Sequence, residues 1–373
     1  MDYVRAATAT FTEAPFNNID ALVFCQIFYP KLEVVLDGDG VSRLNAGYRV
    51  RDFWRNEYAD EMFCDEITDR DNIKFFAEIA ASRRFRDIKI SNLVAETTAS
   101  DEKQFAACRF GIDEETDFVC FRGTDGSLLG WKEDFNLSFM KEVPSQGEAV
   151  DYINRFYGPG SEGEGRKLYI GGHSKGGNLA VYGGIKCDPS IHDRILGIYS
   201  LDGPGFRDEV VDELHNTPGR EKLNIIKIVP QSSVIGMLLQ NQGEYFIIHS
   251  KAVGIMQHSA YTWQMLDDDF QYVDNMSHSG ELVDRTVHEW LMNATDEERE
   301  RFSSALFDTL FANDINTVHD LKHLTPSAVA GILRELKDMD EPTQETVRSM
   351  LKGLARAGFE ASIGQLRQGD DPE

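Results

Sequence analysis

The chain has 373 residues, 41% of them hydrophobic, and its 63 acidic and 38 basic side chains give a formal net charge of −25 at pH 7. This length accommodates one large domain, or one domain with an appended module, and the hydrophobic content is enough for a sizeable core. The negative charge repels phosphate groups and anionic lipid surfaces, so it argues against nucleic acid or an anionic membrane as a partner.

The cysteines and the N-terminus bear on the compartment. No C-x-x-C pair occurs among the five cysteines, which favours a reducing compartment; they are Cys25, Cys64, Cys108, Cys120 and Cys187. The first residues lack a basic segment followed by an apolar one, so we expect no signal peptide. No run approaches the roughly 18 apolar residues of a membrane span. No metal-ligand cluster or dinucleotide fingerprint is apparent. We therefore expect a cytoplasmic protein that needs neither a metal nor a cofactor.

Residues 1–86 are predicted to be mostly helical. Residues 19–28 are apolar on nearly all sides, which is typical of a buried helix, and Pro30 ends it. Residues 71–80 repeat apolar side chains at three-to-four spacing and are predicted to form a second helix. Three short runs rich in β-forming residues come next, and each is predicted to be a strand: 90–98, 104–110 and 117–122.

Helices and strands then alternate, which indicates an α/β architecture, a mostly parallel central sheet with helices on both faces. The predicted helices span residues 131–139 and 148–156, the segment after Ser174, and residues 208–215. The predicted strands span residues 168–171, 195–201, 223–229 and 245–250.

From about residue 280 onward the strand signals stop and amphipathic helical stretches follow, at 289–291, 297–311, 327–336 and 345–357. Thr295 is expected to cap the second of them, because acidic residues fill the turn after it. We expect one domain over residues 1–280, a helical module with an unknown protein partner over 281–368, and a disordered tail over 369–373.

The most informative segment is Gly172-His173-Ser174-Lys175-Gly176, which lies between a predicted strand and a predicted helix. In that context its G-x-S-x-G pattern is typical of the nucleophile elbow of α/β-hydrolases. The turn presents Ser174 at its apex, and side chains at the two glycines would clash with neighbouring backbone. We expect Ser174 to be a nucleophile; the alternative is a glycine-rich turn with an incidental serine.

A serine nucleophile needs a base, and the base needs an orienting carboxylate. In this fold they follow the serine in the order acid, then histidine. Of the nine histidines, His258 lies in the loop after the last predicted strand, where such enzymes place the base. For the acid we favour Asp202, at the carboxyl end of a predicted strand, where open α/β sheets bind ligands. Its alternative role is to cap the Gly-Pro turn that follows. Glu244 and residues 267–269 are the other candidates for the acid.

An oxyanion hole requires backbone N–H groups beside the attacked carbonyl. Lys175, directly after the nucleophile, is expected to supply one of them. Thr124 or Asp125, in the loop after the third predicted strand, is expected to supply the other, and the hydroxyl of Thr124 is a further candidate donor.

These segments resemble known families. Phe121-Arg122-Gly123-Thr124, followed by Trp131 and Asp134 and combined with the elbow, resembles the lipase class 3 family. A fuller set resembles more closely a bacterial family of unknown function, DUF2974, also called Mbeg1-like; the matching segments are 130–136, 172–180, 202–206, 229–237 and 257–263. The resemblance covers roughly residues 15–270. It implies an α/β-hydrolase fold but no settled substrate.

Two positions depart from class 3 lipases. Those enzymes carry the triad acid in an Asp-x-Val-Pro stretch where this chain has Lys227-Ile228-Val229-Pro230, so the acid is expected one strand earlier, at Asp202, as in pancreatic-type lipases. Lys175 stands where lipases usually carry an apolar residue. It either binds an acidic group of the substrate or forms an ion pair with a nearby carboxylate, and the ion pair is the default expectation.

The combination predicts a lipase-like or esterase-like serine hydrolase. It would cleave a small acyl ester or a lipid through an acyl-enzyme on Ser174, with His258 as general base. An acyltransferase or thioesterase with the same triad is one alternative. A non-catalytic scaffold, whose acidic C-terminal helices dock a partner, is an alternative from another class. The apolar stretch 234–239 is either core, an acyl-pocket wall or a lid.

Overall fold

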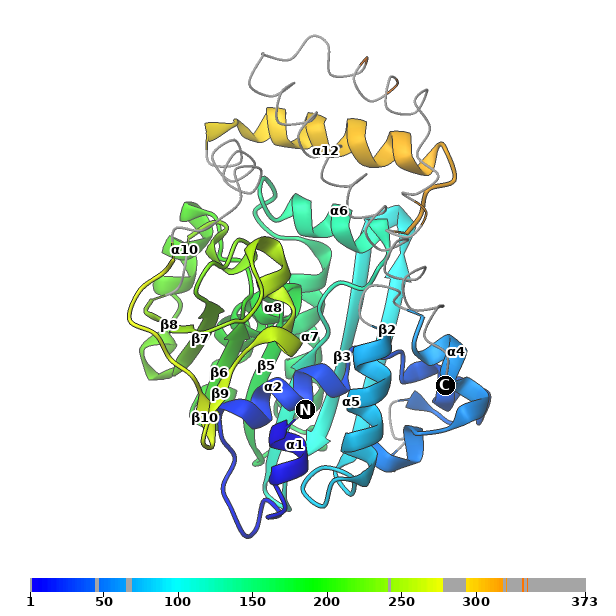
Figure 1. Ribbon diagram of the computed structural model, residues 1–373. Helices are drawn as coiled ribbons and strands as arrows, with labels where there is room; N and C mark the ends of the chain where they lie inside the picture. Colours follow the sequence, from blue (N-terminus) through cyan, green and yellow to red (C-terminus); the bar gives the residue numbers. More distant parts are fainter. Residues whose placement is uncertain are drawn as a thin grey trace.

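A computed structural model of the chain describes residues 2–43, 47–64, 69–240, 243–277 and 293–317, together with residues 320, 331 and 334. At its centre is an eight-stranded sheet in which the strands lie in sequence order (Figure 1). The strands are β1 (Tyr48–Arg49), β2 (Lys89–Thr98), β3 (Lys103–Gly111), β4 (Thr116–Phe121), β5 (Lys167–His173), β6 (Ile195–Leu201), β7 (Ile225–Pro230) and β8 (Tyr245–Ile248). The first four pair antiparallel, and β4 to β8 are parallel. A separate hairpin joins β9 (Met265–Leu266) to β10 (Asp269–Phe270).

Helices cover both faces of this sheet (Figure 1). The α-helices are α1 (Asp2–Ala6), α2 (Asn18–Ile27), α3 (Glu33–Gly38), α4 (Ala59–Met62), α5 (Asp69–Ala81), α6 (Leu128–Asn136), α7 (Pro144–Tyr157), α8 (Lys175–Lys186), α9 (Pro189–His192), α10 (Asp208–His215) and α12 (Asp296–Phe311). Short 3₁₀ helices span η2 (Val50–Phe53), η3 (Asn56–Tyr58), η4 (Ala99–Asp101), η5 (Arg220–Lys222), η6 (Ile235–Met237), η7 (Gly254–His258) and η8 (Ala260–Thr262). This is the α/β-hydrolase fold that the sequence predicted.

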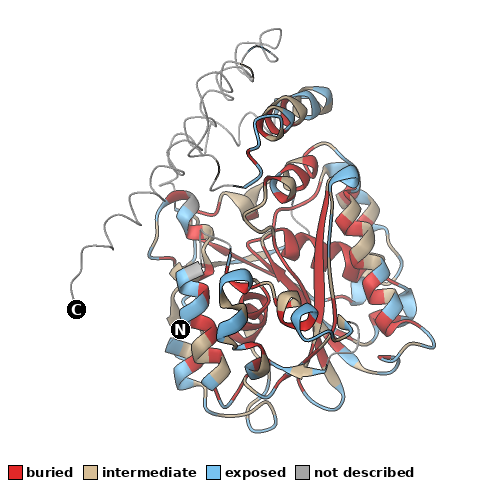
Figure 2. Cartoon of the chain, turned by 90° about the vertical axis from the view of Figure 1, so that its right-hand side faces the viewer, coloured by how far each residue is buried: buried red, intermediate tan, exposed pale blue. Residues whose placement is uncertain are grey.

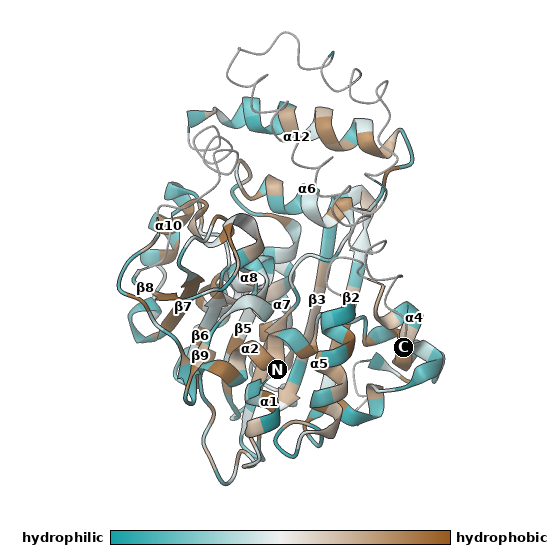
Figure 3. Cartoon of the chain, viewed as in Figure 1, coloured by the Kyte–Doolittle hydropathy of each residue, from teal (hydrophilic) through white to brown (hydrophobic). Residues whose placement is uncertain are grey.

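Strand β4 shows why both faces of the sheet must be covered by helices. Phe118 and Cys120 point into a core formed with the N-terminal helices, whereas Val119 and Phe121 point into a core formed with α7, α8 and α10. Side chains alternate between the faces of a strand, so a strand covered on both sides is apolar at every position. Figures 2 and 3 show the strands of the sheet as largely buried and apolar between helices whose outer surfaces are exposed and polar.

The N-terminal segment is more varied than the sequence predicted. The helix expected at 19–28 is α2; it begins with a capping box at Asn17, and its side chains are buried from Ile19 to Ile27. The strand β1, however, lies in this segment and pairs antiparallel with β2 through Tyr48 and Arg49. A strand of two residues is too short to produce a pattern of alternation, so its existence depends on the neighbouring strand.

In the C-terminal segment, α12 begins with the predicted cap at Thr295, whose hydroxyl accepts a hydrogen bond from Glu298 N. It packs on α6, with the rings of Phe302 and Phe135 5.0 Å apart and Lys132 Nζ 2.8 Å from Asp308 Oδ1. The helices predicted at 289–291, 327–336 and 345–357 lie outside the described residues, apart from residues 331 and 334, as does the tail 369–373. Within the described ranges, no helix combines the length and the apolar character needed to cross a bilayer.

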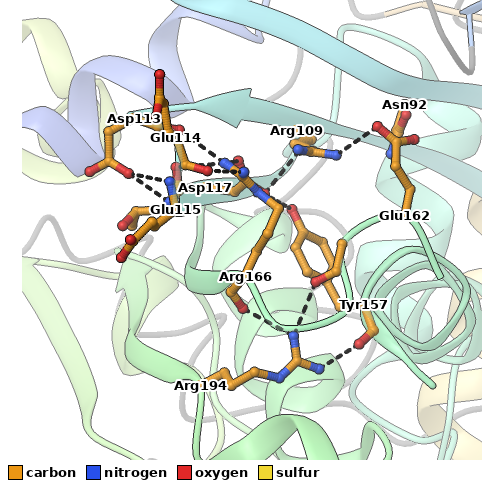
Figure 4. Close-up of polar contacts among 12 residues, drawn as sticks. Asn92, Arg109, Asp113, Glu114, Glu115, Asp117, Tyr157, Glu162, Arg166 and Arg194 are labelled. Atoms are coloured by element: carbon orange, nitrogen blue, oxygen red, sulfur yellow. Dashed lines mark hydrogen bonds and ion pairs between the residues drawn. The ribbon is translucent and has the colours of Figure 1, made fainter. Parts of the chain in front are cut away.

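A buried ion-pair network fixes the amino ends of β4 and β5 (Figure 4). The carboxylate of Asp117 is fully buried and accepts hydrogen bonds from Arg166 Nε at 2.6 Å and Tyr157 Oη at 3.1 Å, and Arg109 Nε lies 2.9 Å away. Because these partners come from β3, from α7 and from the residue before β5, the network holds this end of the sheet together. The carboxyl ends of the parallel strands, where such sheets bind ligands, lie at the opposite edge.

Candidate active site

Ser174 occupies a tight turn between β5 and α8. Its backbone has φ 58° and ψ −132°, a left-handed conformation that costs energy for any residue except glycine. A Cβ atom at Gly172 would lie 2.2 Å from the carbonyl carbon of Gly176, and one at Gly176 would lie 2.2 Å from Phe121 O. Both positions therefore require glycine. The turn leaves the Ser174 side chain partly exposed at the carboxyl edge of the sheet.

His258 and Asp202 are brought together by the fold. His258 Nδ1 lies 2.7 Å from Asp202 Oδ2; the carboxylate is fully buried, and the imidazole is 24% exposed. An ionised carboxylate only accepts hydrogen bonds, so Nδ1 carries the proton and Nε2 is left as an acceptor. Within the described residues, no hydrogen bond joins the Ser174 hydroxyl to this ring.

The second oxygen of Asp202 is held by a residue that the sequence did not indicate. Ser233 donates its hydroxyl to Asp202 Oδ1, and the same hydroxyl oxygen accepts a hydrogen bond from Gly236 N at 2.9 Å. Ser233 lies in the loop after β7, so this loop supplies a hydroxyl that holds the carboxylate of Asp202 in place. The apolar stretch 234–239 contains η6 and is half-buried beside Asp202.

Lys227, the departure from the class 3 pattern, is buried on β7. Its Nζ donates a hydrogen bond to Gly203 O at 2.8 Å, next to Asp202 in the chain. Burial lowers the pKa of Lys227 to about 8, and the negative charge of Asp202 opposes that shift. The ammonium of Lys227 thus lies beside the segment that carries the buried carboxylate.

His173 connects the elbow to the loop of His258. Its Nε2 lies 2.8 Å from His258 O, and its Nδ1 lies 2.6 Å from Tyr29 Oη. A carbonyl only accepts, so Nε2 carries the proton and Nδ1 accepts from the tyrosine. Burial, and secondarily the proximity of His258, lower the pKa of His173 to about 3, so this imidazole is neutral. No role was predicted for His173, because the sequence around a single histidine does not indicate which residues its ring contacts.

The two segments expected to form an oxyanion hole both contact α6. Thr124 Oγ1 donates a hydrogen bond to Asp134 Oδ2 at 2.6 Å, so its hydroxyl hydrogen is engaged there, and the backbone N–H remains the candidate oxyanion donor. Asp125 Oδ1 accepts from Ser127 N at 2.8 Å. Burial raises the pKa of Asp134 to about 6, and the charge of Lys175 opposes that rise.

Lys175 forms the ion pair that was its default expectation. Its Nζ lies 2.9 Å from Glu133 Oε2, and both side chains are buried. Among the other carboxylates considered for the acid, Asp269 contacts Asn18 and Tyr272 at the β9–β10 hairpin rather than His258. Within the part of the chain that the structure describes, no three side chains of the ligand types His, Cys, Asp and Glu are grouped to hold a metal ion.

Comparison with known proteins identifies a family that this chain matches. The sequence model of the family described as Mbeg1-like matches residues 79–308, a span that includes the elbow, Asp202 and His258. No curated protein matches the chain. Similar solved structures include a Rhizomucor miehei lipase with its propeptide, at 16% identity over 62% of this chain and 68% of that chain, with a TM-score of 0.37.

Two further lipases are similar at the same low level. A fungal lipase bound to an inhibitor has 14% identity over 61% of this chain and 88% of that chain, with a TM-score of 0.33. M37 lipase has 16% identity over 57% of this chain and 67% of that chain, with a TM-score of 0.31.

Proposed function

The chain belongs to the Mbeg1-like family, and we propose that it is a serine hydrolase that cleaves a carboxylic ester through an acyl-enzyme on Ser174. The observation that carries this proposal is the 2.7 Å contact between His258 Nδ1 and the buried Asp202. A carboxylate at Nδ1 holds an imidazole in the tautomer whose Nε2 can accept a proton, and it stabilises the imidazolium that forms. The His258 ring lies 4.6 Å from the ring of His173, the residue before the serine.

In the proposed reaction, Ser174 Oγ attacks the ester carbonyl while its proton passes to His258 Nε2. The tetrahedral intermediate collapses, the C–O bond to the alcohol breaks, and the alcohol leaves with the proton from Nε2. Water then attacks the acyl-enzyme, giving its proton to Nε2, and collapse of the second intermediate releases the carboxylic acid and restores Ser174. The N–H groups of Lys175 and of Thr124 or Asp125 are proposed to stabilise both oxyanions.

The surroundings of the base favour an apolar acyl group. Val253 and Met256, in the segment that leads to His258, are 65% and 62% exposed. We propose that these two side chains form part of the rim of the site, where apolar side chains gain free energy by contact with a hydrocarbon chain. We therefore propose a small acyl ester or a lipid as the substrate. All five cysteines carry free thiols, in keeping with the proposed cytoplasmic location.

Labelling with a fluorophosphonate tests this proposal, because the probe reacts only with an activated serine. We expect the wild type to be labelled, Ser174→Ala to be unlabelled and His258→Ala to be labelled at least tenfold more slowly. Ser190→Ala, which removes an exposed serine on α9, is the matched control and should react as the wild type does. A folded wild type that is not labelled would favour the non-catalytic scaffold, and a panel of esters and thioesters with alcohol acceptors would separate hydrolase, thioesterase and acyltransferase.

A further inference from the structure

The ion pair of Lys175 and Glu133 connects the nucleophile elbow to α6. Lys175 is the first residue of α8, directly after Ser174, and its Nζ lies 2.9 Å from Glu133 Oε2. The two side chains are 1% and 0% exposed. Lys175 Nζ also donates a hydrogen bond to Gln104 O on β3 at 2.8 Å, so the pair contacts a further element of the fold.

Glu133 uses both carboxylate oxygens. Oε2 accepts from Gln104 N at 2.9 Å in addition to Lys175, and Oε1 accepts from Ser145 N, in the first turn of α7, at 3.0 Å. The carboxylate thus fixes α6 against β3, α7 and the start of α8 at once. A buried carboxylate whose hydrogen bonds are all formed, such as that of Glu133, is held in one defined position.

The next residue on α6 contacts the other half of the proposed oxyanion hole. Asp134 Oδ2 accepts the hydroxyl of Thr124 at 2.6 Å. Helix α6 also approaches this loop closely, because a Cβ atom at Gly130 would lie 2.7 Å from Thr124 Cγ2 and 2.2 Å from Gln104 Oε1. Consecutive acidic residues of one helix therefore contact the two segments whose N–H groups would have to converge on one oxygen.

The attraction between the two charges by itself contributes little to stability. An apolar pair of similar volume in place of a buried ion pair is often neutral or stabilising, since two desolvated charges are costly. What an ion pair adds is directional hydrogen bonding, and in this place it adds a charge as well. The Lys175 ammonium opposes the rise in the pKa of Asp134 that burial causes.

We propose that Lys175 and Glu133 are positioning residues that hold the two N–H-bearing segments of the oxyanion hole in register through α6. This inference rests on the proposed hydrolase function. A displacement of about 1 Å in such a site costs on the order of 100-fold in rate, and loss of one donor costs about 100- to 1,000-fold in kcat. The pair would therefore matter to the transition state more than to substrate binding.

The test replaces both charges at once, by Lys175→Met with Glu133→Leu, so that no unpaired charge is buried. With a short p-nitrophenyl ester, we expect kcat to fall about 10- to 100-fold and KM to stay within about twofold. The thermal unfolding midpoint should fall as well, because Gln104 N and Ser145 N lose their buried acceptor. The matched control is Lys103→Met with Glu148→Leu, which removes an ion pair that joins β3 to α7 away from the serine. It should leave kcat within twofold.

A folded double variant with kcat within twofold of the wild type would overturn the inference. Should the double variant not fold, Glu133→Gln keeps the shape of the side chain and decides in the same way: a fivefold or greater loss of kcat supports the inference, and a loss within twofold overturns it. A wild type that neither hydrolyses esters nor reacts with the fluorophosphonate would instead count against the proposed function itself. An active wild type with unaffected variants counts against the positioning role alone.

Discussion

The Nε2 atom of His173 donates a hydrogen bond to the backbone carbonyl of His258 across 2.8 Å. The residue before the elbow serine thus holds the loop of the proposed base, although 85 residues separate them in the sequence. The hydrogen bond from Tyr29 Oη to His173 Nδ1, at 2.6 Å, requires a neutral ring, because a protonated Nδ1 could not accept it. Protonation of this ring would break that bond and place a charge in a buried site.

This arrangement predicts that the fold loses stability in acid. The pKa of His173 is about 3 in the folded chain, against 6.5 for an ordinary histidine. Between those two pKa values the unfolded chain binds a proton at this residue and the folded chain does not. The contribution of the neutral His173 to the free energy of unfolding is therefore complete above pH 6.5 and is lost as the pH falls toward 3. From pH 7 to pH 4.5 we expect a loss of about 2 to 3 kcal/mol from this group. Urea unfolding of the wild type and His173→Gln at both pH values measures it, and equal losses in the two proteins would contradict the prediction.

Ser233 is predicted to contribute to activity through Asp202. Ser233→Ala removes the donor from Asp202 Oδ1 and leaves a buried charged oxygen with one hydrogen bond fewer, which costs about 1.5 to 3 kcal/mol. We expect kcat to fall about tenfold, since the carboxylate loses its fixed orientation toward His258. Ser232→Ala is the control, because the neighbouring hydroxyl contacts Ser277 instead. Steady-state kinetics of the two variants decide, and equal kcat values would refute the role of Ser233.

The sequence predicted the elements of the fold because their signals are local. Apolar runs and alternation located every strand from β2 to β8, and the cap at Thr295 predicted the start of α12. Helix α7 begins at Pro144, whereas the pattern placed it at residue 148. Gly147 weakens the helical signal of its first turn, and the capping contact of Gln146 with Val143 N compensates for it.

The partners within the site were less predictable. The strand–turn–helix context of Ser174 and the order of Asp202 and His258 narrowed the candidates to residues that the fold does bring to one edge of the sheet. Ser233 and Glu133 left no such trace, because the first meets Asp202 across 31 residues and the second meets Lys175 across 42. The sequence around a hydroxyl or a carboxylate does not indicate which residue it contacts when that residue is so far away in the chain.

Gly236 is predicted to be required for the position of Asp202. A Cβ atom at residue 236 would lie 2.3 Å from Asp202 Oδ1 and 2.8 Å from Ser233 Oγ, so Gly236→Ala must displace the carboxylate from His258. We expect a loss of kcat of about tenfold or more. Gly147→Ala on α7 is the control, since its Cβ would meet no atom nearer than 3.5 Å, and it should stabilise the helix by about 0.5 to 1 kcal/mol without changing kcat. Unchanged kcat in Gly236→Ala would contradict the tight packing around Asp202.

The ionised carboxylate of Asp134 is predicted to lower the free energy of unfolding and to raise kcat. Its pKa is raised from 3.8 to about 6 by burial, so the folded chain prefers the protonated carboxyl, and the ionised form costs stability above pH 6. Asp134→Asn removes that cost, and we expect a gain of about 1 to 3 kcal/mol at pH 8 that disappears near pH 4, where the wild-type carboxyl is itself largely protonated. The neutral amide accepts the Thr124 hydroxyl more weakly than a carboxylate does, so kcat at pH 8 should fall several-fold. Urea unfolding at the two pH values and kinetics at pH 8 measure both effects, and a variant that is less stable than the wild type at pH 8 would show that the carboxylate contributes to the fold rather than to the site.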